Sequence, residues 1–216
     1  MKYKIVISLI LTYILLAAHG IHANGSKSQN VPQSAQDICP IKVGQNIPKI
    51  NLETIEGEPF DLNEAVGKKP TLLIVYRGGW CPYCNAELRA LQEMLPEITD
   101  LGATLVAISP ETPDNSLSTT EKNALTFEVL SDQGNRLARD FGLVFSLPDA
   151  LRPIYEKLGI DLAATNGDET FELPVPATFV IDGKGVVRHA FVDADYTQRL
   201  DPVEVVDALR KVAADN

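Results

Sequence analysis

The sequence contains few residues that could bind a metal ion. It has three cysteines and three histidines, and two of the histidines lie within the first 23 residues. A zinc site needs four ligands. Beyond the two cysteines of the motif described below, only Cys39 and His189 remain, and neither has the spacing of a ligand. The sequence therefore predicts no metal and no cofactor.

Basic residues are scarce relative to acidic ones. The chain has 19 lysines and arginines against 29 aspartates and glutamates, which gives a formal net charge of −10 at pH 7. An acidic surface without a basic patch argues against nucleic acid and against electrostatic docking to anionic lipid. We expect neither as a partner.

The sequence has no internal repeat and no domain linker, and its one long apolar run is at the N-terminus. Residues 5–18 are largely apolar and follow two lysines, and the small residues Gly20 and Ala23 come next. This pattern is typical of a secretory signal peptide, which we place at residues 1–23. A retained membrane anchor is the alternative, although the run is short for a span of about 20 residues. We expect an exported protein, periplasmic or secreted, with no stable membrane insertion after signal removal.

Residues 24–40 are polar, and we expect them to form a flexible segment ahead of one domain at residues 41–216. Cys39 falls in this segment. It could resolve an oxidised active-site thiol, pair with another subunit or be buried. Burial is the expectation, because free cysteine is among the most buried residue types.

Strand and helix patterns alternate along residues 41–216. The expected strands are two within 43–60, then 72–76, 103–108, 127–130, 173–181 and 186–192, and the expected helices are 61–65, 82–101, 113–123, 135–141, one ending near 158, and 202–212. This order predicts an α/β fold with a central mixed, mostly parallel sheet and helices on both faces. Residues 144–171 are the least regular, and both a lid and a packing excursion remain open.

The motif that carries chemistry is Cys81-Pro82-Tyr83-Cys84, which follows an apolar run at residues 71–76 and a glycine pair. Glycine permits a tight turn, and Pro82 suits the first position of a helix. Both thiols then lie in the first helical turn, where free N–H groups and the helix dipole stabilise a thiolate. Half a zinc site and an inert structural disulfide are the alternatives, but so short a bridge constrains little unfolded-chain entropy. The motif favours redox chemistry.

The segment from Trp80 to Cys84, together with Val175-Pro176 before a later strand, resembles a thioredoxin fold. In that superfamily the later proline is cis and packs against the dithiol, and Pro176 matches it by position. The resemblance implies a thioredoxin-like fold in which Val175 and Pro176 shape a docking groove and Trp80 shields the site.

Over residues 41–213 the pattern is similar to the AhpC/TSA group, the peroxiredoxins. In that register Cys84 takes the position of the peroxidatic cysteine. Cys81, Arg77 and Pro176 take the positions of the threonine, proline and arginine that cradle a peroxide. Cys81 and Pro176 are instead what a thioredoxin-type exchange site needs. The resemblance therefore implies a peroxiredoxin-like subgroup with a thioredoxin-type dithiol.

Glu87 lies three residues after the second cysteine, where exported thioredoxin-like reductases carry an acid, and a surface glutamate is the alternative. Cys81 and Cys84 are the expected catalytic pair. The residues expected to shape the site are Arg77, Trp80, Pro82, Tyr83, Glu87, Val175 and Pro176.

The first functional hypothesis is thiol–disulfide exchange with an antioxidant role outside the cytosol, in which Cys81 is the more exposed thiol. Cys81 attacks the disulfide of a partner protein, and Cys84 resolves the mixed disulfide. The second hypothesis is peroxide reduction. Cys84 attacks hydrogen peroxide or an alkyl hydroperoxide, Cys81 condenses with the sulfenic acid, and Arg77 lies near the thiolate.

Both hypotheses describe a thiol redox enzyme that needs an electron donor, either a thioredoxin-like protein or a membrane-relayed one. A third hypothesis is not catalytic: an exported metal-binding or interaction domain that uses the dithiol as ligands, with His189 more simply explained as a surface or core residue. The sequence favours the redox enzyme and leans modestly towards exchange.

Overall fold

A computed structural model of the chain describes residues 31–214, so the expected signal peptide lies outside the described residues. The strands are β1 (Asn51–Thr54), β2 (Pro59–Asp61), β3 (Thr71–Val75), β4 (Thr104–Ser109), β5 (Glu128–Ser131), β6 (Val144–Ser146), β7 (Glu172–Pro174), β8 (Ala177–Ile181) and β9 (Val187–Val192). The helices are the 3-10 helix η1 (Ala35–Asp37), α1 (Leu62–Val66), α2 (Pro82–Asp100), α3 (Pro113–Asn123), α4 (Arg136–Asp140), α5 (Arg152–Lys157), α6 (Leu162–Asn166) and α7 (Pro202–Ala214).

Seven strands form one mixed sheet in the order β2-β1-β5-β4-β3-β8-β9. The β3–β4 and β4–β5 pairs are parallel, and the other four neighbouring pairs are antiparallel. The mixed sheet is confirmed, but the expectation that it is mostly parallel is wrong. Only the crossovers through α2 and α3 return the chain in the same direction, whereas β1–β2 and β8–β9 are hairpins.

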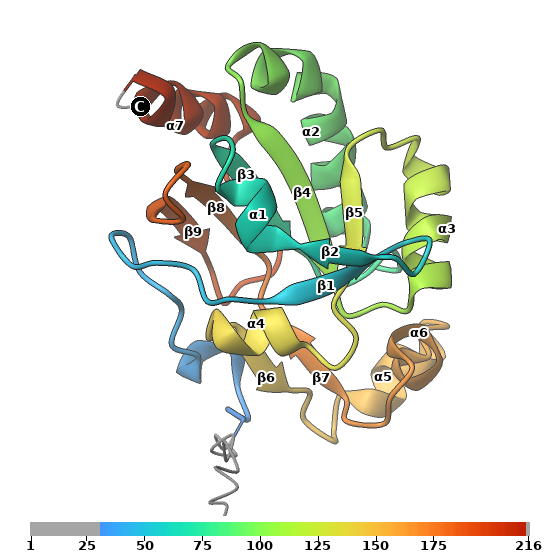
Figure 1. The fold of residues 1–216 in the computed structure, drawn as a ribbon. Coiled ribbons are helices and arrows are strands. Elements are labelled where there is room, and N and C mark those ends of the chain that lie inside the picture. The colour runs from blue at the N-terminus through green and yellow to red at the C-terminus, as the bar shows by residue number, and fades with distance from the viewer. Residues whose placement is uncertain (1–30, 215–216) are drawn as a thin grey trace, which may run out of the picture. The chain divides into compact units, whose positions relative to one another are not determined.

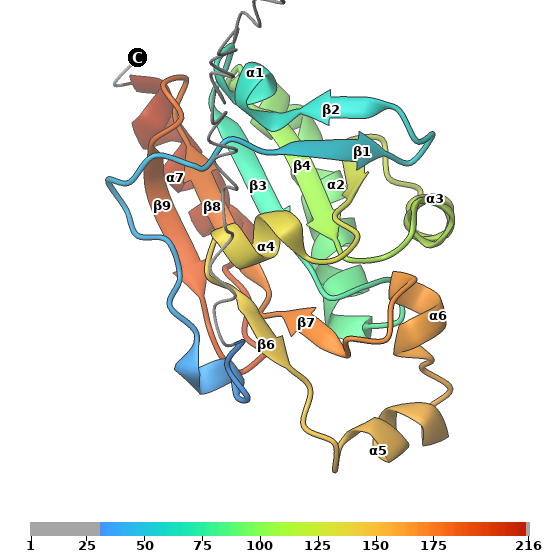
Figure 2. The same ribbon diagram turned by 60° about the horizontal axis from the view of Figure 1, so that its bottom comes forward.

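Helices cover both faces of the sheet, as expected (Figures 1 and 2). The side chains of β3 alternate between two apolar clusters. Leu72 and Ile74 belong to the cluster with α2 and α7, and Leu73 and Val75 belong to the cluster with α1 and α4. Because β3 is buried on both faces, its sequence is continuously apolar. This arrangement confirms the α/β thioredoxin-like fold.

The segment before β1 is part of the packed domain. We expected residues 24–40 to be flexible, but from Val31 onward the chain lies against β6 and the core. The N–H of Ser146 donates to the carbonyl of Pro32 at 2.8 Å, and Ile38 packs against the cluster that contains α1 and α4. The described domain therefore begins ahead of the expected boundary.

The irregular region between β6 and β7 packs at the end of the sheet where β3 finishes and α2 begins (Figure 2). β6 and β7 form a separate two-stranded sheet, and α5 and α6 lie between them in the chain. Leu147, Leu162 and Leu173 form its core, against which Trp80 and Tyr155 pack. The region is thus a packed excursion that also reaches the dithiol segment.

No helix within residues 31–214 has the length and apolar character of a membrane span.

Candidate active site

The dithiol lies at the corner between β3 and α2. β3 ends at Val75, and α2 begins at Pro82, the first helical residue, as expected. Cys81 is the N-cap residue and Cys84 lies in the first turn. The Cys81 N–H donates to the carbonyl of Gly78 at 3.0 Å, which closes the turn. The predicted placement of both thiols at the start of the helix is confirmed.

The glycine pair in this turn is required by close neighbours. Gly78 has φ +148°, and a Cβ there would overlap Trp80 Nε1 and lie 3.1 Å from Glu111 Oε1. A Cβ on Gly79 would overlap the hydroxyl of Thr119. The turn is therefore tightly enclosed, and a side chain at either position would displace the residues around the dithiol.

Both thiols are free and both are buried, at 1% exposure for Cys81 and 0% for Cys84. Cys81 is the more exposed of the two, as expected, but the difference is only 1% against 0%. Hydrogen bonding by the Cys84 thiol, together with the charges of Arg77 and Arg199, lowers the pKa of Cys81 to about 6. Burial raises the pKa of Cys84. The pair therefore carries one negative charge at neutral pH, and the remaining proton lies on Cys84.

Arg199 is a site residue that the sequence did not reveal. Its Nη2 donates to Cys84 Sγ at 3.5 Å, and its Nε donates to Glu87 Oε2 at 2.7 Å. Its Nη1 donates to the main-chain carbonyls of Tyr196 and Gln198. Four hydrogen bonds thus fix the guanidinium, and one of them is to the buried sulfur. One N–H of Nη2 is left for a further acceptor.

No local pattern marks Arg199, because it lies 115 residues after Cys84 in the loop between β9 and α7. The signal that could have found it is topological. The loop leads into α7, which packs beside α2 in the cluster that contains both cysteines. A basic residue there is placed to reach the start of α2.

Glu87 is a buried partner of this arginine, so the alternative of a surface glutamate is wrong. Its side chain is 8% exposed, and the Thr178 hydroxyl lies 3.5 Å from Oε1. Burial raises the pKa of Glu87 to about 7, and Arg199 opposes that shift by favouring the carboxylate. Glu87 thereby orients Arg199 towards Cys84.

Arg77 supplies a second cation near the dithiol. It is 3% exposed, and its guanidinium lies 4.8 Å from the ring centroid of Trp80, 5.8 Å from that of Tyr155 and 4.2 Å from that of Tyr196. It also donates to the Tyr155 hydroxyl. These cation–π contacts compensate part of its desolvation. Its charge helps to lower the pKa of Cys81, in line with the expected position near the thiolate.

Aromatic rings form the outer wall of the site. Trp80 is partly buried, packs against the cluster that contains both cysteines, and lies edge-on to Tyr155 with ring centroids 5.7 Å apart; its role as a shield stays a prediction. Tyr83 is exposed and packs edge-on against Tyr196 at 5.8 Å. Pro82 is exposed beside it. Two of the four rings, from α5 and the loop before α7, come from outside the predicted motif.

Val175 and Pro176 do not form the expected docking groove. Both are buried, and the Val175 N–H donates to the carbonyl of Leu143 at 2.9 Å. Ala177, the next residue, pairs with Val75 at the end of β3. Residues 31–214 contain no cis peptide bond, so the expectation of a cis Pro176 is wrong. The two residues support the corner from within the fold, because the excursion that ends at β7 covers them.

Cys39 and His189 lie away from this arrangement. Cys39 is exposed, so the expected burial is wrong.

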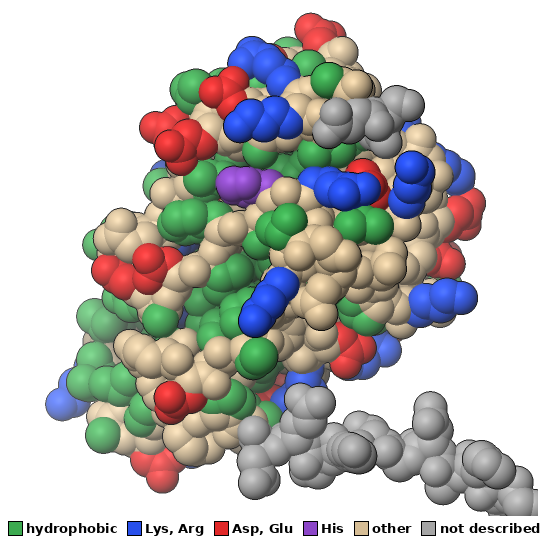
Figure 3. Space-filling model, turned by 90° about the vertical axis from the view of Figure 1, so that its left-hand side faces the viewer, with side chains coloured by type: hydrophobic (Ala, Val, Ile, Leu, Met, Phe, Trp, Pro, Cys, Tyr) green, Lys and Arg blue, Asp and Glu red, His purple; other side chains and the backbone are tan. Residues whose placement is uncertain are grey.

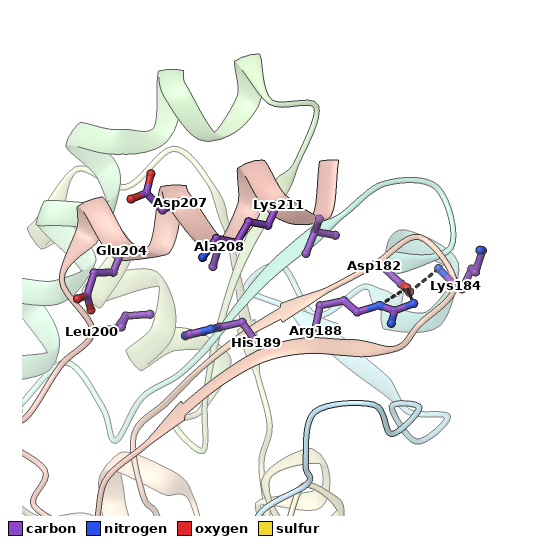
Figure 4. Close-up of a pocket in the computed structure, with 10 residues that line it drawn as sticks. Asp182, Lys184, Arg188, His189, Leu200, Glu204, Asp207, Ala208 and Lys211 are labelled. Carbon is purple, nitrogen blue, oxygen red and sulfur yellow. Dashed lines mark hydrogen bonds and ion pairs between the residues drawn. The ribbon is translucent and has the colours of Figure 1, made fainter. Parts of the chain in front are cut away.

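His189 lines a cavity of about 560 Å³ between β9 and α7 (Figure 4). Lys211 and Arg188 also line this cavity, and Arg188 pairs with Asp182. Neither cysteine of the motif lines it. Acidic and basic side chains intermix on the upper part of the face seen in Figure 3, and hydrophobic ones gather below. Within residues 31–214 no cluster of three or more potential ligands could hold a metal.

Comparisons with known proteins agree with the fold and identify the family. The AhpC/TSA family model matches residues 43–190. The chain is 26% identical over 198 residues to the chloroplastic peroxiredoxin Q of Sedum lineare, covering 90% of this chain and 91% of that protein. It is 26% identical over 164 residues to peroxiredoxin Bcp of Escherichia coli K12, covering 76% and 94%.

Solved structures show the same fold at lower identity. Peroxidoxin BcpB from Mycobacterium tuberculosis superposes with a TM-score of 0.62 at 20% identity, covering 80% of this chain and 98% of that one. A peroxiredoxin-like protein from Aquifex aeolicus gives 0.63 at 18% identity, covering 81% and 89%. Because the family match spans more than half of its residues, the chain belongs to the AhpC/TSA family and is a peroxiredoxin-like enzyme of the thioredoxin superfamily.

Proposed function

We propose that the protein reduces hydroperoxides with the Cys81–Cys84 dithiol, and that Cys84 is the attacking sulfur. One observation carries the proposal: both sulfurs are buried, and the Arg199 guanidinium contacts Cys84. A sulfur with at most 1% exposure is accessible to a small peroxide more readily than to a disulfide held on a protein surface. The structure thus favours the second hypothesis over the exchange reaction towards which the sequence leaned.

The chemistry of the cycle follows from the proton shared by the two sulfurs. When that proton moves from Cys84 to Cys81, the thiolate forms on Cys84 beside Arg199. Its attack breaks the O–O bond and gives a Cys84 sulfenic acid and an alkoxide, or hydroxide from hydrogen peroxide. The alkoxide takes the proton of Cys81 and leaves as the alcohol. The Cys81 thiolate then displaces hydroxide from the sulfenic acid, which forms the disulfide.

The two arginines stabilise charge where this reaction develops it. Nη2 of Arg199 has an N–H left to donate to a peroxide oxygen, and Glu87 holds the guanidinium in place before the substrate arrives. A small cavity of about 230 Å³ is lined by Arg199, Glu87 and Tyr83 among others, so a small molecule can approach this arginine. Arg77 adds a second positive charge near Cys81.

The resulting disulfide must be reduced by two electrons in each cycle. A thioredoxin-like dithiol protein is the reductant that suits the disulfide of a peroxiredoxin-like enzyme. The N-terminal pattern at residues 1–23 supports the further proposal that the protein works after export, in the periplasm or outside the cell. A dedicated donor or a membrane relay would keep the dithiol reduced there.

Thiol–disulfide exchange is the second candidate, and the lowered pKa of Cys81 favours it. A thiolate at the N-cap of a helix is the attacking group of that reaction. The aromatic wall over Cys81 would then have to open for a protein substrate.

Stopped-flow kinetics of the reduced protein separates the two candidates. We expect the protein to react with hydrogen peroxide and with an organic hydroperoxide about a hundredfold faster, or more, than a free thiol reacts with the same peroxides. The reason is that Arg199 stabilises the leaving oxygen. A disulfide-bonded protein should react far more slowly. Peroxide rates equal to those of a free thiol, with a fast reaction of the protein disulfide, would establish exchange instead. Cys39→Ser is the control, because Cys39 is exposed and lies outside the motif.

A further inference from the structure

We propose that Glu111 and Asn85 are positioning residues that hold the Gly79 peptide from both sides. They fix Cys81 against Cys84, so that the disulfide closes within a folded first turn of α2. The inference rests on the dithiol cycle proposed above. It adds two residues that lie outside the motif chemistry and a physical role for each of them.

The Gly79 residue is bound at both of its main-chain polar groups. Glu111 Oε2 accepts the Gly79 N–H at 2.9 Å, and Asn85 Nδ2 donates to the Gly79 carbonyl at 2.7 Å. Glu111 is 2% exposed and Asn85 is 5% exposed. Hydrogen bonds in so dry a setting are costly to break, because the groups left behind find no water.

Each of the two side chains is itself held by a neighbouring element. The Thr119 hydroxyl donates to Glu111 Oε2 at 3.3 Å, and the Ser109 hydroxyl lies 3.4 Å from the same oxygen. On the other side, Asn123 Nδ2 donates to Asn85 Oδ1 at 2.9 Å. The network thus joins the end of β4, α2 and α3 around one residue of the corner.

The position of Gly79 sets the geometry of the two sulfurs. Cys81 follows two residues later, and its N–H is bonded to the carbonyl of Gly78. Cys81 and Cys84 are three residues apart at the start of a helix, so their side chains lie on one face. A disulfide tolerates only a narrow range of Cβ–Cβ distances, and a fixed corner keeps the pair within it. The first turn of α2 then needs no unfolding for the bond to form.

The clamp on Gly79 needs an acceptor at position 111, and it does not need a charge there. Burial raises the pKa of Glu111 to about 7, so the side chain is present in both protonation states near neutral pH. A glutamine at this position offers a carbonyl oxygen of similar reach to the Gly79 N–H. Glu111→Gln therefore separates positioning from electrostatics.

The test is the equilibrium between the protein dithiol and glutathione disulfide, which gives the protein disulfide and two glutathione thiols. We expect Glu111→Ala and Asn85→Ala each to lower this equilibrium constant about tenfold, the size expected for loss of one buried hydrogen bond. Glu111→Gln should retain the wild-type constant within about twofold. Gln92→Ala is the control, because Gln92 also makes hydrogen bonds from α2, to Thr126, but these are exposed and involve neither Gly79 nor the cysteines.

Two outcomes would overturn the proposal. An unchanged constant in both alanine variants would mean that the corner needs no clamp. A constant in Glu111→Gln as low as in Glu111→Ala would mean that Glu111 acts through its charge. If Glu111→Ala does not fold, Asn85→Ala tests the same residue from its other side. Because the equilibrium uses no peroxide, failure of the clamp is distinguishable from failure of the proposed peroxidase activity.

Discussion

Replacement of Cys84 by serine is expected to abolish peroxide reduction, with a loss of roughly a thousandfold or more, because a serine hydroxyl is not ionised at neutral pH. The partly buried Arg199 would then have no thiolate to orient against a peroxide. The measurement is the consumption of hydrogen peroxide by the variant with excess dithiol reductant. Cys39→Ser should retain the full rate.

The companion variant Cys81→Ser separates attack from resolution. It should still consume one peroxide per chain and then stop as a Cys84 sulfenic acid, which a sulfenic-acid reagent would label. The reverse pattern, in which Cys84→Ser performs the first step and Cys81→Ser does not, would assign the attack to Cys81. The lowered pKa of Cys81 makes that reverse pattern a real test.

Arg199→Met should lower the second-order rate constant with peroxide by about a hundredfold, the loss expected when one preorganised donor is removed. Methionine keeps the apolar stem but removes the N–H groups that contact Cys84 and Glu87. The rate constant of Arg199→Lys should lie between those of the wild type and Arg199→Met. A lysine ammonium keeps the charge but lacks the planar fork that binds both partners at once. The measurement is the rate of dithiol oxidation at pH 7.

The matched control for this variant is Arg188→Met. Arg188 is also paired with a carboxylate, Asp182 at 2.7 Å, but it is exposed and lies on β9 away from the dithiol. A rate unchanged in Arg188→Met and lowered in Arg199→Met would assign the effect to the site. Equal losses in both variants, or no loss in Arg199→Met, would contradict the role given to Arg199.

The local structure could be predicted from the sequence because it depends on short-range chemistry. The apolar run of β3 indicated a strand buried on both faces, and Pro82 indicated where α2 begins. The helix expected at residues 61–65 is α1, and the Asp61 carboxylate caps it by accepting the Glu64 N–H at 3.0 Å. The strand directions were harder to predict. The apolar pattern of β8 indicates a buried strand, but it does not indicate whether that strand runs parallel or antiparallel to β3.

The site could be predicted only where its residues lie in one segment. Arg77, Trp80 and Glu87 surround the cysteines within a few positions along the chain, and all three lie at the site. Arg199 and Tyr155 arrive from elements joined by tertiary packing alone, which no spacing in the sequence encodes. The same packing buries Cys81 almost as fully as Cys84, and it buries Pro176, which was expected to shape a docking groove.

A hydrogen bond from the Cys84 thiol and the charges of the Arg77 and Arg199 guanidiniums together hold one negative charge on the buried dithiol. Titration of the thiolate by its ultraviolet absorbance in the reduced Cys39→Ser protein measures that charge directly. We expect one thiolate per chain to form with a midpoint near the value of about 6 reached by the pKa of Cys81, so that peroxide reduction rises as the pH increases through this range. Absence of any thiolate below a pH of about 8.5, the value for free cysteine, would contradict the account.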